Sequence, residues 1–435
     1  MRSSASILAG SIACVALFSA ARAELTIEIT EGVTDPIPIA IVPFGWAGIG
    51  NAPFDVAELL ARDLRSSGRF TPMARADMIE LPTRGEDVEL DDWRLLRNDF
   101  VVVGQLQPGA EGRYTIQFEL INVLNGQKLL NYQQPATTAT LRAASHRVAD
   151  LLFEKLTGIR GAFATRIAYV AVEGQVPNRR FQLIVADADG ENPRVAAEST
   201  EPLMSPAWSP DGQTLAYVSF ESRVASIYTQ YLRTGERRRV SARAGINGAP
   251  AWSPDAQRLA LTLSRKDGNL DIYVLGLVEQ VLTRITDDNG IDTEPVWSPD
   301  GKSLYFTSDR SGNPQIYRVG LAPGDRPQRV TFEGTYNARP RLSPDGSTLA
   351  MVTLDQGAYR IGVLDLNSGS ARVLTEGRLD ESPSFAPNGA VLIYGTQDRG
   401  RGVLATVSVD GSVQQRLAAE HGDIREPVWA PFPTP

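Results

Sequence analysis

The sequence has very few of the residues that supply transition-metal ligands and thiol chemistry. Its 435 residues include one cysteine, Cys14, and two histidines, His146 and His421. A single cysteine cannot form an internal disulfide, and no histidine pair or cysteine cluster is available for a transition metal. His146 falls in an expected helix and His421 in a polar loop, so we expect both at the surface rather than as metal ligands.

Motifs for catalysis and cofactor binding are missing as well. The sequence has no G-x-S-x-G elbow, no phosphate-binding loop and no dinucleotide-binding fingerprint. Asp187-Ala188-Asp189-Gly190 starts like a calcium-binding loop but lacks the distal glutamate, so a hairpin turn explains it better. We therefore expect no catalytic residues, no metal site and no cofactor, and we expect a protein that is not an enzyme.

The chain also lacks a net positive charge and a membrane-spanning run. Its formal net charge is −8 and it has no basic run, so the sequence predicts no positively charged surface for nucleic acid or anionic lipid. Arg2, the apolar residues 7–18 and Ala21-Arg22-Ala23 have the pattern of a secretion signal, and the apolar part is too short to span a membrane. We expect residues 1–23 to be removed on export, and Cys14 with them.

What the sequence does contain is a repeated phrase. Pro295-Val296-Trp297-Ser298-Pro299-Asp300-Gly301 recurs, with variations, at residues 206–212, 250–255, 340–346, 383–389 and 427–431. The copies are about 44 residues apart, which is the period of a four-stranded propeller blade. Ser-Pro-Asp-Gly suits a type I turn. The tryptophan before it is expected to pack between neighbouring blades, with its indole N–H needing a partner.

The number of blades follows from the two ends of the repeat. Strands of the Leu-Ala-Tyr-Val type number six only if Ile167-Ala168-Tyr169-Val170 is included, and no turn phrase precedes that strand. The last phrase has no further strand after it. We infer that the strand around Val428 and Trp429 completes the first blade and closes the ring, which removes the free sheet edges. Residues 165–435 are thus predicted to form an all-β, six-bladed β-propeller closed by the C-terminal strand.

Residues 35–160 have the mixed pattern of a small N-terminal α/β domain. Strands are expected at residues 37–42 and 100–104, and Asp55 is placed to cap a helix. A hairpin is expected to turn at Asn125-Gly126, and Thr140 is expected to cap the final helix.

The segment before this domain alternates in polarity. Leu25, Ile27 and Ile29 are separated by polar residues, which is the period of a strand with one buried face. This strand is either the first strand of the α/β domain or a mobile strand that pairs with the sheet edge of another protein. Periodicity does not distinguish the two.

Acidic residues recur in the loops before the repeated phrase: Glu201, Glu294, Glu381 and Glu426, with Asp292 close to one of them. If each phrase opens the innermost strand of a blade, these carboxylates gather near one mouth of the ring. They are either ordinary solvated loop charge or, as a set, a docking surface for a partner.

The order of these parts resembles the TolB family of the Tol-Pal system. The similarity covers the whole chain: a secretion signal, an α/β domain running into Ile39-Ala40-Ile41-Val42-Pro43-Phe44-Gly45-Trp46, six repeats with Trp-Ser-Pro-Asp-Gly turns, and a closing Pro427-Val428-Trp429-Ala430-Pro431. The resemblance implies a monomeric periplasmic scaffold that does not insert into a membrane. It also implies a role in outer-membrane integrity and in outer-membrane constriction during cell division.

The resemblance further implies two partner sites. TolB-like proteins bind the peptidoglycan-associated lipoprotein Pal across the propeller mouth, and three residues match positions at that interface: Ala249, Thr293 and Glu294. Their mature N-terminal segment binds the C-terminal domain of TolA, which assigns that role to residues 24–34, beginning at Glu24. Family members can carry histidine just before the Asn-Gly-Ala-Pro phrase, where this chain has Ile246.

Two other classes of protein share the propeller pattern. One is an exported propeller hydrolase or peptidase, and the other is a propeller that binds a small ligand in its central channel. Propeller peptidases join the ring to a large hydrolase domain with serine and histidine at set positions. The domain before Gly158 is too small for that and lacks such a motif.

Overall fold

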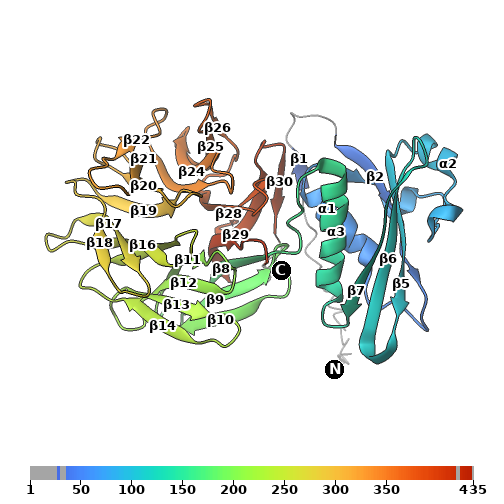
Figure 1. Ribbon diagram of the computed structural model, residues 1–435, viewed down its shortest axis with the longest axis horizontal. Helices are drawn as coiled ribbons and strands as arrows, with labels where there is room; N and C mark the ends of the chain where they lie inside the picture. Colours follow the sequence, from blue (N-terminus) through green and yellow to red (C-terminus); the bar gives the residue numbers. More distant parts are fainter. Residues whose placement is uncertain (1–26, 30–35, 418–421, 434–435) are drawn as a thin grey trace, which may run out of the picture.

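The chain forms a small α/β domain and a six-bladed β-propeller (Figure 1). The computed structural model describes residues 27–29, 36–417 and 422–433. Helices α1 (Val56–Ser66) and α3 (Leu141–Thr157) lie between the α/β sheet and the propeller, so the two bodies meet through helices. The predicted fold class is confirmed.

The α/β domain is built on one mixed sheet. Its strands follow the order β4-β2-β5-β6-β7, and β3 also pairs with β5. The pairs β2–β4, β2–β5 and β3–β5 are parallel, whereas β5–β6 and β6–β7 are antiparallel. The strands are β2 (Ile37–Ile41), β3 (Gly45–Trp46), β4 (Phe70–Pro72), β5 (Phe100–Pro108), β6 (Arg113–Asn122) and β7 (Lys128–Thr137).

Local sequence explains where the helices begin. The Asp55 carboxylate accepts a hydrogen bond from the backbone N–H of Glu58 at 3.1 Å, so the predicted cap of α1 is confirmed. Thr140 stands at the N-cap position of α3, but its hydroxyl accepts from the N–H of Thr137 and makes no capping bond. Both helices bury apolar side chains against one sheet face, and the short helix α2 (Leu90–Leu95) buries Trp93 within a second apolar cluster.

Each propeller blade is a four-stranded antiparallel sheet. The second blade contains β11 (Leu203–Trp208), β12 (Thr214–Ser219), β13 (Ser226–Tyr231) and β14 (Arg237–Ser241). The third contains β15 (Asn247–Trp252), β16 (Arg258–Ser264), β17 (Leu270–Gly276) and β18 (Leu282–Arg284). The fourth contains β19 (Asp292–Trp297), β20 (Ser303–Ser308), β21 (Gln315–Gly320) and β22 (Gln328–Arg329). The fifth and sixth are β23 (Asn337–Leu342), β24 (Thr348–Asp355), β25 (Ala358–Asp365) and β26 (Ala371–Val373), then β27 (Glu381–Phe385), β28 (Val391–Asp398), β29 (Arg401–Ser408) and β30 (Val413–Arg416).

The first blade contains both ends of the propeller sequence. Its order is β10-β9-β8-β31, with β8 (Arg166–Glu173), β9 (Arg180–Asp187), β10 (Arg194–Ser199) and the C-terminal β31 (Asp423–Trp429). β31 is antiparallel to β8 and supplies the innermost strand of this blade. The predicted closure by the C-terminal strand is confirmed.

The repeated phrase joins neighbouring blades. In the turn between β19 and β20 of the fourth blade, the N–H of Gly301 donates to the carbonyl of Ser298 at 2.9 Å, and Gly301 has a φ of 67° that favours glycine. The indole N–H of Trp297 donates to the backbone carbonyl of Ala251 in the preceding blade at 3.1 Å. Trp208 and Trp252 make the same bond to their preceding blades. The predicted packing of these rings between blades, with a partner for the N–H, is therefore confirmed.

Candidate functional site

A ring of six residues surrounds the central channel of the propeller. Each residue directly precedes the proline of the repeated phrase and has φ between 44 and 56°: Ser205, Ala249, Glu294, Arg339, Ser382 and Glu426. A positive φ is unfavourable for residues other than glycine, so the surrounding sheet must hold it. The strand register shifts at this point in every blade, which is the signature of a β-bulge.

The channel behind this ring has a volume of about 580 Å³. Tryptophans and prolines of the repeated phrase supply much of its wall. Its charged lining consists of Glu294, Arg339, Arg341 and Glu426. The channel is thus a mainly apolar cavity with a few placed charges, which is the usual composition of a binding site.

Glu294 and Arg339 form the best-connected pair of the ring. The Nε of Arg339 lies 2.8 Å from Oε1 of Glu294, and the N–H of Arg339 donates to Oε2 at 3.1 Å. Burial disfavours the charged guanidinium, but Glu294, Glu426 and Glu381 outweigh it and raise the pKa of Arg339. Burial also raises the pKa of Glu426, whose carboxylate accepts from the N–H of Ser205. The ring is therefore held by bonds between blades.

Buried polar side chains shape the loops at the mouth. In four blades the residue two before the ring position is a buried asparagine or aspartate: Asn247, Asn337, Asp292 and Asp380. Asn247, for example, donates to the carbonyl of Arg243 at 2.7 Å and accepts from the N–H of the same residue at 3.0 Å. These contacts fix the loop conformations before any partner arrives.

Exposed apolar side chains stand just outside these buried groups. Ile246, Ile291 and Leu379 directly precede Asn247, Asp292 and Asp380, in that order, and are 49%, 45% and 38% exposed. We call these three residues the apolar rim. Sequence analysis missed the rim as a set, although the repeat register places its members at equivalent positions.

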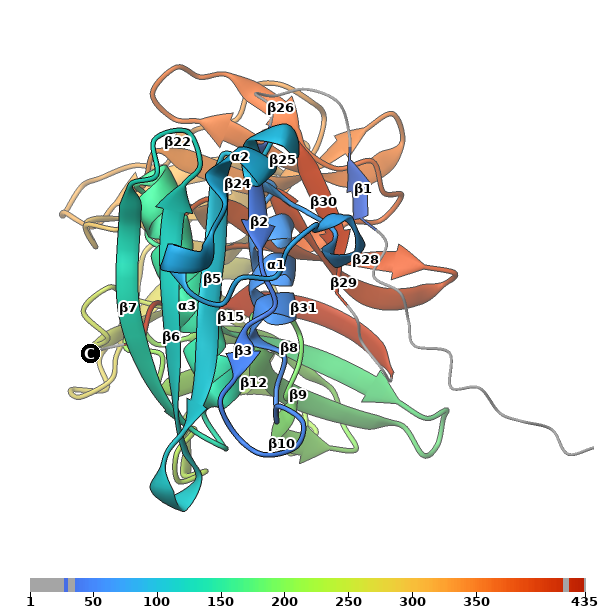
Figure 2. The same ribbon diagram turned by 90° about the vertical axis from the view of Figure 1, so that its right-hand side faces the viewer.

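The N-terminal strand lies against the propeller rather than in the α/β sheet. β1 (Ile27–Ile29) is antiparallel to β30, the outermost strand of the sixth blade, with Glu28 opposite Gln414 (Figure 2). Its interpretation as the first strand of the α/β domain is therefore wrong. Glu24 and Leu25 lie outside the described residues.

Comparison with known proteins identifies the family. A model described as the TolB beta propeller domain matches residues 153–433, and one described as the TolB amino-terminal domain matches residues 25–129. The chain belongs to the TolB family. The Tol-Pal system protein TolB of Thioalkalivibrio sulfidiphilus is 51% identical over 414 residues, which cover 95% of each chain. The protein of the same name from Xanthomonas euvesicatoria is 48% identical over 94% of each.

A solved structure agrees with this assignment. The crystal structure of TolB from Acinetobacter baumannii has a TM-score of 0.86 and 39% sequence identity, and the match covers 94% of this chain and all of that one. Within the described part of this TolB-family chain, no helix is both long and apolar enough to cross a membrane.

The predicted mouth residues of this TolB-family protein do not all lie together. Ala249, Glu294 and Glu426 line the channel, whereas Glu381 is half-buried, with Oε2 3.9 Å from Nη1 of Arg339. Thr293 is half-buried on β19, 3.4 Å from the hydroxyl of Thr262. Two other predicted members do not line the channel. The exposed Glu201 is outside the channel lining, and Asp292 is fully buried.

Asp292 has a structural partner instead. Its two carboxylate oxygens accept from Nη2 of Arg310 at 2.9 and 2.8 Å. A carboxylate that is inaccessible and already paired cannot contact a docked protein. Its placement on the docking surface is therefore wrong, because acidic identity alone does not reveal which way a loop residue points.

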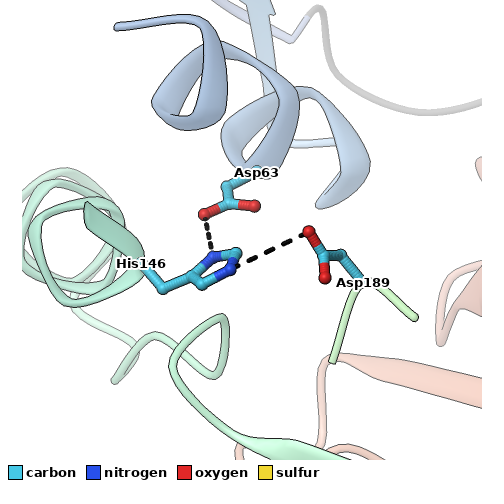
Figure 3. Close-up of side chains that lie close together, drawn as sticks. All are labelled: Asp63, His146 and Asp189. Atoms are coloured by element: carbon cyan, nitrogen blue, oxygen red, sulfur yellow. Dashed lines mark hydrogen bonds and ion pairs between the residues drawn. The ribbon is translucent and has the colours of Figure 1, made fainter. Parts of the chain in front are cut away.

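His146 lies at the contact between the two bodies, not at the surface as we expected from the sequence. It is 2% exposed, and its Nδ1 is 2.7 Å from Oδ2 of Asp63 (Figure 3). Its Nε2 faces Oδ2 of Asp189, in the turn after β9, at 3.8 Å. Arg62 and Arg142 also pair with Asp189. His421 lies outside the described residues.

This cluster is better suited to an ion-pair network than to a metal. The three groups offer ligand atoms within 4.8 Å of one another. However, Asp63 already occupies one histidine nitrogen, and two guanidinium groups occupy Asp189. A transition metal needs three or four free ligands and no adjacent cations. The turn interpretation of residues 187–190 is confirmed, with the N–H of Gly190 donating to the carbonyl of Asp187.

We predict that His146→Gln destabilises the protein more at low pH than at high pH. Burial lowers the pKa of His146, but Asp63 and Asp189 outweigh burial and raise it. The histidine contribution is thus fully present below its unfolded pKa of about 6.5 and is lost as the pH rises through the folded value. Denaturant unfolding should show a stability gap between the parent and the variant of about 1–3 kcal/mol near pH 6.

This gap should shrink towards pH 9. Arg147→Gln, on the exposed side of the same helix, should leave stability unchanged at both pH values. A gap that is constant across the range would contradict the role of protonated His146.

Proposed function

We propose that the protein is a non-enzymatic periplasmic adaptor of the Tol-Pal system. The propeller mouth would bind Pal, and the N-terminal strand would bind the C-terminal domain of TolA. The adaptor would thereby support outer-membrane integrity and outer-membrane constriction during cell division. Family membership and the names of the relatives support the system, and the geometry of the two surfaces supports the division of labour.

The mouth has the features of a protein docking surface. The apolar rim lies in the loops that lead into the ring, which carries the charges of Glu294, Arg339 and Glu426, and buried polar groups hold these loops in place without a partner. Protein interfaces combine an apolar centre with polar groups that set orientation, and a preorganised surface loses less conformational entropy on binding. The exposed apolar rim is the single observation that carries this half of the proposal.

The strand β1 has the features of an exchangeable segment. Three described residues pair with β30, so only a short ladder holds β1 in place. The same main-chain groups could add a strand to a sheet edge of TolA. Ordering the backbone of one residue costs about 1–2 kcal/mol, and this cost is the same whether β1 docks on the propeller or on a partner. The two docked states would therefore be closely balanced in free energy.

Acidic substitutions in the apolar rim should weaken Pal binding. The variant Ile246→Asp/Ile291→Asp would place carboxylates on the docking surface that lose water when a partner covers them, and we expect at least a tenfold loss of affinity in calorimetry. Both side chains are exposed, so the melting temperature should change little.

The matched control is Val278→Asp. Val278 is 78% exposed on the loop between β17 and β18, away from the mouth residues. This control should bind Pal like the parent protein. Unchanged affinity in the rim variant would remove the basis for docking at the mouth.

A further inference from the structure

Arg341 lies inside the propeller channel and makes no direct ion pair with a carboxylate in the described part of the chain. Its Nη1 donates to the carbonyl of Pro340 at 2.8 Å. Among the described residues, no acidic oxygen lies within 4.0 Å of its guanidinium, whereas Arg339 pairs with Glu294. Arg341 lines the channel, and burial lowers its pKa, which the more distant carboxylates of Glu294 and Glu426 only partly offset. The guanidinium thus keeps free N–H donors next to an open cavity.

The position of Arg341 in the repeat makes this charge distinctive. It stands directly after the proline of the repeated phrase, where the other five blades have small or apolar residues: Ala207, Ala251, Val296, Ser384 and Val428. These side chains leave open space around the guanidinium and do not compete for its donors. A guanidinium with free donors beside a cavity attracts an anion, and its planar donors match a carboxylate.

We propose that the channel is a carboxylate-binding site in which Arg341 forms the ion pair. The carboxylate comes either from an acidic side chain of a protein docked on the mouth or from a small free carboxylate. The first source rests on the proposed function, and the second does not. Serine hydroxyls of the channel wall, from Ser205, Ser382 and Ser384, offer further hydrogen bonds to the bound group.

Glu426 allows a test of whether the bound group is negatively charged. It lines the same channel, and its carboxylate has no guanidinium within 4.0 Å among the described residues. An ionised Glu426 repels an incoming carboxylate. Neutralising Glu426 should strengthen anion binding, whereas neutralising Arg341 should weaken it.

The experiment uses malonate and the exported chain, from residue 24 onward. Calorimetry should give weak binding to the parent protein, with a dissociation constant of about 1 mM. Arg341→Gln should weaken binding at least about tenfold, and Glu426→Gln should strengthen it several-fold. Arg238→Gln, on the exposed outer strand β14, should change nothing. Crystals soaked in malonate should place a carboxylate on Arg341.

A competition experiment distinguishes the two sources. If a docked protein supplies the carboxylate, Arg341→Gln weakens Pal binding and malonate competes with Pal. If the carboxylate is free, Arg341→Gln loses malonate but binds Pal normally. Failure of the parent protein to bind Pal would count against the proposed function and leave the malonate result standing. Malonate binding that is unchanged in Arg341→Gln, or that is located outside the channel, overturns the proposal.

Discussion

Deletion of residues 24–34 should abolish TolA binding and leave Pal binding intact. The deleted segment contains β1, which supplies the main-chain donors and acceptors for strand addition and pairs with the outermost strand of the sixth blade, whereas the channel is lined by residues of the innermost strands. Surface plasmon resonance against the purified TolA C-terminal domain should show loss of binding beyond detection. The same preparation should keep its parental affinity for Pal. Equal loss of both partners would contradict two separate sites.

A crosslinked variant tests whether β1 must leave the propeller. Glu28 and Gln414 are directly opposite one another on antiparallel strands, at a separation that a disulfide can bridge. Glu28→Cys/Gln414→Cys, in the chain from residue 24, should lose TolA binding when oxidised and regain it when reduced. Pal binding should not depend on the redox state. TolA binding by the oxidised protein would show that release of β1 is unnecessary.

Removal of residues 423–435 should prevent the propeller from folding. The deletion takes away β31, which covers the fully buried residues Ile167 and Ala168 of β8 and carries the buried Ile424. Trp208 also loses the Val428 carbonyl that accepts from its indole N–H at 3.1 Å. Each buried apolar side chain contributes about 1.5–3 kcal/mol, so the loss approaches the whole stability of a domain, about 5–15 kcal/mol.

The readouts are solubility, size-exclusion chromatography and thermal unfolding. A shorter truncation, of residues 433–435, should behave like the parent protein because it leaves β31 intact. A soluble product of the longer truncation with a parental melting temperature would show that closure of the ring is unnecessary for folding.

The mouth shows how far sequence patterns reach into a functional site. Ala249, Glu294 and Glu426 precede the phrase proline, and all three line the channel. Glu201 and Asp292 were grouped with them because they are acidic, yet one is outside the channel lining and the other is buried against Arg310. The channel-lining members share the position directly before the phrase proline, whereas acidic identity alone does not separate them from Glu201 and Asp292. The pairing of Glu294 with Arg339 could not be predicted, because these residues belong to different blades.

By itself, the sequence determined the number of blades, the closing strand and the role of the turn tryptophans. Each of these depends on a short phrase whose local turn chemistry repeats at a constant spacing. Only the tertiary structure decided that His146 is buried against Asp63, that β1 lies on β30, and that Arg341 lines the channel without a direct ion pair to any described carboxylate. Those outcomes depend on groups far apart in the chain, whose burial and pairing are set when the domains and blades pack together.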